Sequence, residues 1–108
     1  MTEEVRKLVD SQLGVNRTSV KNHGTDLLSM LVPPRAIQVI ARMVKDGQVS
    51  DETIDAWLIG QEKIVDGYRI ILRDDGQTFG LASKGFPTDK HPILMGWYGS
   101  LQNTFLGM

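Results

Sequence analysis

Residues 67–83 read Gly67-Tyr68-Arg69-Ile70-Ile71-Leu72-Arg73-Asp74-Asp75-Gly76-Gln77-Thr78-Phe79-Gly80-Leu81-Ala82-Ser83, and residues 93–98 read Ile93-Leu94-Met95-Gly96-Trp97-Tyr98. An Asp-Gly dipeptide between two runs of β-branched and aromatic residues is the strongest local signal for a tight hairpin turn. We therefore predict a two-residue turn at Asp75-Gly76. We expect residues 93–98 to form the third strand of an antiparallel β-meander over about residues 67–98.

The position of the turn sorts the side chains into two faces, because side chains alternate along a strand. With Asp75-Gly76 at the apex, Leu72 pairs with Phe79 and Arg69 pairs with Ala82. One face then carries the apolar side chains Tyr68, Ile70, Leu72, Phe79 and Leu81. The other face carries Arg69, Ile71, Arg73, Thr78, Gly80 and Ala82. If the third strand lies beside residues 79–82, Ile93, Met95 and Trp97 can join the apolar face, and Leu94, Gly96 and Tyr98 the other.

The second face is the candidate ligand site. Glycine inside a strand often marks close approach by a ligand or by another backbone. The predicted ligand-binding residues are Arg69, Arg73, Gly80, Gly96 and Tyr98. A packed helix or the same face of a second subunit would need the same small side chains, so these two alternatives stay open.

Length and composition indicate a single domain over residues 1–108, which is near the commonest domain size. The formal net charge is −1, which favours no particular class of partner. The chain has no cysteine, which excludes disulfides and cysteine-ligated metals. No segment has the ~20 apolar residues of a membrane span. We expect a cytoplasmic protein without cofactors or bound metals.

The amino-terminal part, about residues 1–60, is predicted to be helical. Thr2 can cap a first helix whose apolar face ends before Gly14. Two short helices are predicted over residues 17–22 and 26–31. Polar residues at intervals of three or four between residues 35 and 45 favour two helices within 34–60, joined at Gly47. The competing interpretation of residues 36–60 is a β-hairpin, because residues 39–44 are β-branched and Asp46-Gly47 is itself a turn signal.

The carboxyl-terminal element, residues 100–108, is predicted to be a short turn of helix capped by Ser100. Its apolar side chains, Leu101, Phe105 and Leu106, are expected to face inward, in the core or in an interface. Since a small sheet exposes its edges and one face, we expect a twofold homodimer. The predicted interface residues are Trp97, Phe105 and Leu106.

Residues 6–24 resemble a degenerate helix-turn-helix of DNA-binding proteins. The resemblance lies in Gly14 at the tight turn and in the polar run that follows it, and it implies that Arg17, Thr18 and Lys21 face the major groove. The residue four before the glycine is Asp10, where the motif needs a small side chain. DNA binding is the alternative function.

A third hypothesis is an enzyme that uses His91, with Asp89 orienting the imidazole. Neither a nucleophile motif nor a phosphate-binding glycine loop supports it, so we predict no catalytic residues and leave the enzyme question open. Taken together, the sequence predicts an α+β protein in which helices pack on a three-stranded antiparallel sheet. The expected function is that of a non-enzymatic, self-associating binding or regulatory protein for a small molecule or protein partner.

Overall fold

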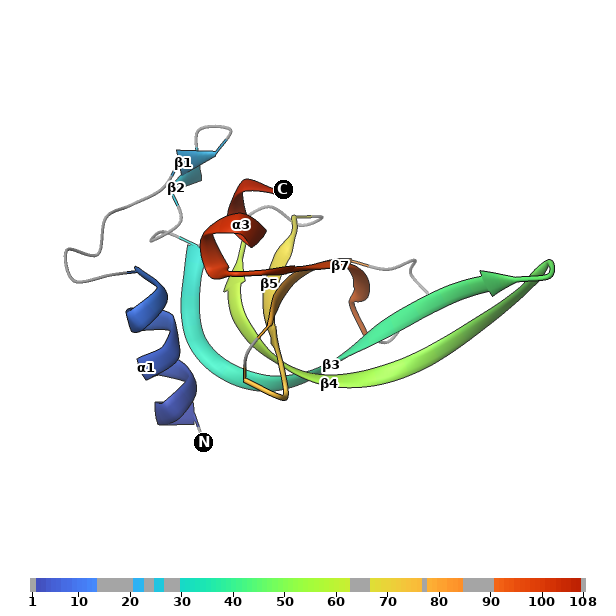
Figure 1. The fold of residues 1–108 in the computed structure, drawn as a ribbon, viewed down its shortest axis with the longest axis horizontal. Helices are drawn as coiled ribbons and strands as arrows, with labels where there is room; N and C mark the ends of the chain where they lie inside the picture. The colour runs from blue at the N-terminus through green and yellow to red at the C-terminus, as the bar shows by residue number, and fades with distance from the viewer. Residues whose placement is uncertain are drawn as a thin grey trace.

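The structure, a computed structural model, describes residues 2–13, 21–22, 25–26, 30–62, 67–76, 78–84 and 91–107. The elements in chain order are α1 (Thr2–Leu13), β1 (Lys21–Asn22), β2 (Thr25–Asp26), β3 (Leu31–Lys45), β4 (Gln48–Gln61), β5 (Arg69–Arg73), β6 (Phe79–Ser83), β7 (Ile93–Gly99) and α3 (Leu101–Leu106). Strands β3 to β7 form a closed barrel in sequence order, and β1 pairs with β2 (Figure 1). The predicted α+β class is therefore wrong, because the fold is mostly β.

The largest correction concerns residues 34–60, which form the β3–β4 hairpin and not two helices. Asp46 and Gly47 have positive φ angles of 53° and 76°, the conformation that a tight two-residue hairpin turn needs. Two of the polar residues that suggested a helical stripe instead bond across the hairpin. Gln38 donates to Asp55 at 3.1 Å, and Arg42 contacts Asp51 at 2.9 Å. The alternative hairpin interpretation is the correct one.

The distal part of this hairpin projects from the barrel as a two-stranded arm (Figure 1). Beyond Ile40 in β3 and before Ala56 in β4, the described residues of the two strands pair only with each other. Three exposed apolar side chains lie near its tip: Met43, Val44 and Val49. Few contacts outside the ribbon hold this part of the chain.

Substituting Gly47 by alanine tests the turn at the tip of the arm. A left-handed conformation costs a residue with a Cβ about 1–2 kcal/mol. Because nothing in the barrel contacts a Cβ at this position, we expect the loss to be local. Amide hydrogen exchange of Met43 and Ser50, which pair across the hairpin, should accelerate, while that of Ile71 in β5 stays unchanged. Equal acceleration at Ile71 would contradict an independent arm.

The β5–β6 hairpin has the predicted register. Leu72 pairs with Phe79 and Arg69 pairs with Ala82. The Arg73 amide donates to the Thr78 carbonyl at 2.8 Å, and the Gly76 amide donates to the Arg73 carbonyl at 2.9 Å. The second bond places Asp74 and Asp75 at the centre of the turn, with Gly76 after them at a φ of 75°, so the predicted two-residue turn at Asp75-Gly76 is wrong although the strand register is right. Gln77, the predicted partner of Asp74, lies outside the described residues.

Two apolar clusters lie on opposite faces of this hairpin. The first contains the predicted apolar set, with Ile70, Leu72, Phe79 and Leu81 buried and Tyr68 packed beside them. Both helices contribute to it: Val5 and Val9 from α1, Leu101 and Phe105 from α3. The second has buried or partly buried members from all five barrel strands: Val39, Ile37, Ala56, Ile54, Ile71, Ala82, Leu94 and Trp97.

The face that was predicted to be open is therefore largely closed. Ile71 and Ala82 are buried in the second cluster, and Gly80 is buried as well. The predicted face is correct for Leu94, which pairs with Ala82 and packs in the second cluster, but it is wrong for Trp97 and Gly96. Trp97 pairs with Gly80, and Gly96 pairs with Leu81, because the β6–β7 ladder has register shifts between Phe79 and Gly80 and between Leu81 and Ala82. A one-residue shift moves every later side chain to the other face.

The structure confirms some of the predictions for the helices and contradicts others. The first helix is confirmed as α1, with Val5 and Val9 buried. The short helix over 17–22 is wrong where the structure describes it, since Lys21 and Asn22 form β1. Within 26–31, Asp26 lies in β2 and Leu31 begins β3, whereas Met30 is helical as predicted. Ser100 is confirmed as the cap of α3, and its Oγ accepts from the Asn103 amide at 3.1 Å. No helix within the described ranges is long and apolar enough to span a bilayer.

The barrel closes through a parallel pair. Each strand runs antiparallel to the next, so in a meander of five strands the first and the last run in the same direction. Strands β3 and β7 meet at a single residue pair, Ile40 with Ile93. The Ile40 amide donates to the Pro92 carbonyl at 2.8 Å. We call this short contact the β3–β7 seam.

Candidate functional site

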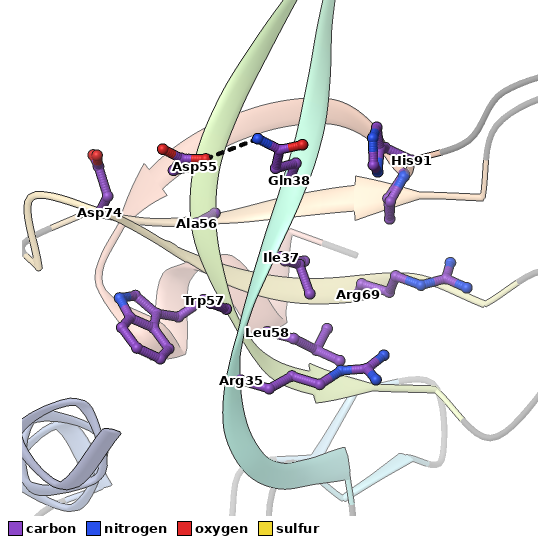
Figure 2. A pocket seen from close by; sticks show the side chains of 12 residues that line it. Arg35, Ile37, Gln38, Asp55, Ala56, Trp57, Leu58, Arg69, Asp74 and His91 are labelled. Carbon is purple, nitrogen blue, oxygen red and sulfur yellow. Dashed lines mark hydrogen bonds between the residues drawn. The ribbon is translucent and has the colours of Figure 1, made fainter. Parts of the chain in front are cut away.

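A groove of about 890 Å³ lies at the β3–β7 seam. Strand β3 supplies one side, β4 and β5 continue it, and His91 and Pro92 stand where the chain enters β7 (Figure 2). The residues that line it are Arg35, Ala36, Ile37, Gln38, Asp55, Ala56, Trp57, Leu58, Arg69, Asp74, His91 and Pro92. Because β3 and β7 separate after a single residue pair, no strand ladder between them fills the groove.

Two arginines reach the groove from the same face of the sheet. Arg35 pairs with Leu58, Leu58 pairs with Ile71, and Arg69 lies two residues before Ile71 in β5. Alternation places all four side chains on one face. Figure 2 shows Arg35 and Arg69 extending to the same side of the β3–β4 pair, the side on which His91 also lies.

Neither arginine is neutralised by a carboxylate within the described part of the chain. Among the described residues, the side chain of Arg69 makes one hydrogen bond, a long one of 3.4 Å from Nη1 to the Gly67 carbonyl. Two acids also line the groove: Asp55 accepts from Gln38, and Asp74 lies on the other side of the β3–β4 pair from both arginines (Figure 2). Arg35 is exposed and Arg69 is half-buried. Their donors are therefore available to a ligand.

The groove combines these donors with apolar surface. Ile37, Leu58 and Pro92 line it together with the arginines and His91. A guanidinium offers several N–H groups in a planar fork that matches a carboxylate, and such charge-assisted hydrogen bonds are stronger than neutral ones. A groove with apolar walls and a few convergent donors is the usual form of a binding site. Within the described ranges no group of three or more His, Asp or Glu side chains could hold a metal ion.

The structure separates the five residues predicted to form the ligand site. Arg69 lies in the groove. Arg73, four residues further on β5, lies with its guanidinium carbon 5.5 Å from the centre of the Trp97 ring, at the distance of a cation–π contact. Gly80 lies under Trp97, and a Cβ there would stand 2.5 Å from both the Gly96 carbonyl oxygen and the Trp97 ring. Close approach by another backbone, and not by a ligand, accounts for this glycine.

The remaining two residues pack against the end of the chain. The nearest atoms to a Cβ at Gly96 would belong to the Tyr98 ring, at 3.7 Å. A Cβ at Gly107, which follows α3, would stand 2.7 Å from the same ring. Tyr98 thus contacts both glycines and helps to place α3 beside β7.

The three predicted interface residues have different surroundings. Phe105 is fully buried in the first apolar cluster, so it is unavailable to a second subunit in this structure. Trp97 is half-buried between Gly80 and Arg73. Leu106 is 54% exposed, contrary to the expectation that it faces inward. Self-association stays a prediction.

The residues of the two alternative functions lie mostly outside the described part of the chain. Arg17 and Thr18 are outside it, and Lys21 lies in strand β1, where the helix-turn-helix resemblance implies a helix. Asp89, the predicted partner of His91, is also outside it. His91 itself lines the groove together with Arg69, and the sequence analysis did not predict that these two residues share a site.

Sequence reasoning missed the contribution of β3 and β4 to this site. Arg35, Gln38 and Asp55 were assigned to helices, so they could not be placed beside Arg69. One signal was available: Gln38 and Asp55 are equidistant from the Asp46-Gly47 turn, as are Arg42 and Asp51. Complementary polar pairs at equal distances from a turn are typical of cross-strand neighbours.

Compared with known protein families, with characterised proteins and with solved structures, the chain matches none.

Proposed function

We propose that the protein is a non-enzymatic binding protein that captures an acidic ligand in the groove at the β3–β7 seam. The observation that carries the proposal is the pair Arg35 and Arg69, which line one groove from one face and have no carboxylate partner among the described residues. His91 adds a further hydrogen-bonding group, and the half-buried Ile37 and Trp57 add apolar contact area.

The proposal predicts that a polycarboxylate binds and that Arg69 is needed. Hydrogen bonds to charged groups contribute about 1.5–3 kcal/mol each, so Arg69→Ala should weaken binding roughly tenfold to a hundredfold. Suitable probes are a fluorescently labelled hexaglutamate peptide, measured by anisotropy, and citrate, measured by calorimetry. Binding should also weaken with added salt, because the contacts are charged.

Arg73→Ala is the matched control. Arg73 lies on the same strand and the same face as Arg69, yet it stacks on Trp97 and does not line the groove. Its replacement removes the same charge and should change affinity less than twofold. If neither hexaglutamate nor citrate binds, or if both substitutions weaken binding equally, the groove is not the site.

A further inference from the structure

The edge of β3 beside the groove has backbone groups without a strand partner. The Ile40 amide points toward β7, since it donates to the Pro92 carbonyl. In a strand the N–H and C=O of one residue point to the same side, and residues two apart point alike. The N–H and C=O of Gln38 and Ala36 therefore also point away from β4, toward the groove that both residues line.

Within the described part of the chain, β7 pairs with β3 only at Ile40, so the edge at Ala36 and Gln38 is open. Both residues are exposed. A row of unpaired N–H and C=O groups is a template for an added strand, and peptide-binding domains use such edges. Prolines occur in β3 only at 33 and 34, so residues 35–40 retain every amide donor.

The two edges of the β3–β4 ribbon differ in charge. The sequence of β3 contains Arg35, Arg42 and Lys45 and no acidic residue. The sequence of β4 contains Asp51, Glu52 and Asp55 and no basic residue. Arg42 and Asp51 neutralise each other across the ribbon, so Arg35 is the β3 charge that lies beside the groove. This charge favours a segment that carries carboxylates.

We propose that the groove receives an extended, acidic segment of a partner protein, which adds as a strand to β3 at Ala36 and Gln38 and places carboxylates against Arg35 and Arg69. This inference rests on the proposed function and makes it specific, because it requires a peptide backbone in the ligand. A small polycarboxylate can accept hydrogen bonds from the two arginines, but it cannot form a strand ladder with the backbone groups of Ala36 and Gln38.

The test compares hexaglutamate with a hexaglutamate whose backbone amides are all N-methylated. The two peptides carry the same carboxylates, but the methylated one cannot donate to β3. We expect at least tenfold weaker binding of the methylated peptide to the unaltered protein. Equal affinity for the two peptides would overturn strand addition and leave the proposed function intact. If citrate binds and hexaglutamate does not, strand addition is likewise contradicted and the proposed function stands. If neither probe binds, both proposals are contradicted.

Substitutions in β3 give a second measurement. Ala36→Pro removes an amide donor that points into the groove and leaves the hydrogen bonds to β4, including that between Gln38 and Asp55, so hexaglutamate should bind at least tenfold more weakly. Val44→Pro is the matched control, since it removes an amide on the same edge of the same strand beyond the groove. It should change affinity less than twofold. Equal effects of the two prolines would contradict the placement of the strand.

A second copy of this chain is the competing occupant, because its own β4 is an acidic strand. That arrangement would give a dimer in light scattering which dissociates when hexaglutamate is added. Such a result would overturn the assignment to a separate partner protein. A scattering mass that stays unchanged on adding hexaglutamate supports the assignment.

Discussion

Replacing Phe105 by alanine is expected to lower the free energy of unfolding by about 3–5 kcal/mol, the range for deleting a buried phenylalanine. The side chain is fully buried between α3 and the first apolar cluster, so little solvent can fill the space that it leaves. A domain of this size is stable by about 5–15 kcal/mol, and the substitution therefore removes a large share of it. Urea denaturation followed by tryptophan fluorescence measures the change.

Leu106→Ala is the control for that substitution. Leu106 is the next residue in the same helix but is 54% exposed. Exposed substitutions usually stay within about 0.5 kcal/mol. A loss at Leu106 as large as that at Phe105 would mean that α3 is turned with its other side toward the barrel, or that Leu106 is buried in an assembly.

Gly80→Ala is expected to be the second most damaging substitution. The added Cβ would stand 2.5 Å from the Gly96 carbonyl oxygen and 2.5 Å from Cε3 of Trp97. The carbonyl belongs to the neighbouring strand and cannot move without opening the β6–β7 ladder. Overpacking a tight core site costs about 1–3 kcal/mol, and we expect the upper part of that range.

Gly96→Ala provides the comparison within the same pair of strands. The nearest atom to a Cβ there is 3.7 Å away, which is ordinary contact, and the backbone angle is one that alanine adopts. Because alanine also restricts the unfolded chain, the free energy of unfolding should stay within about 1 kcal/mol of its original value. Equal losses for the two glycines would contradict the position of Trp97 over Gly80.

The β5–β6 hairpin could be predicted because its information is local. Residues 74–76 mark where the chain turns, and the resulting register determines which of Ile70, Ile71 and Leu72 share a face. The apolar spacing of α1, with Val5 and Val9 buried, is local in the same way. These are the parts of the sequence analysis that the structure confirms.

The β3–β4 hairpin was assigned wrongly because two local patterns conflict there. The intervals between Arg35, Gln38, Arg42 and Lys45 fit a helix, whereas Asp46-Gly47 and the β-branched run before it fit a hairpin. The pairings Gln38–Asp55 and Arg42–Asp51 decide for the hairpin, and they join residues far apart in the chain. Weighing these complementary pairs would have favoured strands.

The groove could not be predicted, because it depends on how the barrel closes. Arg35 and Arg69 are brought together by three strands, and His91 reaches them only because β3 and β7 meet at Ile40 and Ile93. No pattern within one segment encodes that contact. The exchange of Trp97 and Gly96 between faces likewise follows from register shifts in the β6–β7 ladder.

Titration of the ¹⁵N-labelled protein with hexaglutamate tests the central claim most directly, because each backbone amide reports its own surroundings. We predict the largest chemical-shift changes at Ala36, Gln38 and Arg69, with Arg73 and Trp97 unaffected. Shift changes centred on Arg73 and Trp97, or on the arm around Val44, with residues 36–38 unchanged, would contradict a binding edge at the β3–β7 seam.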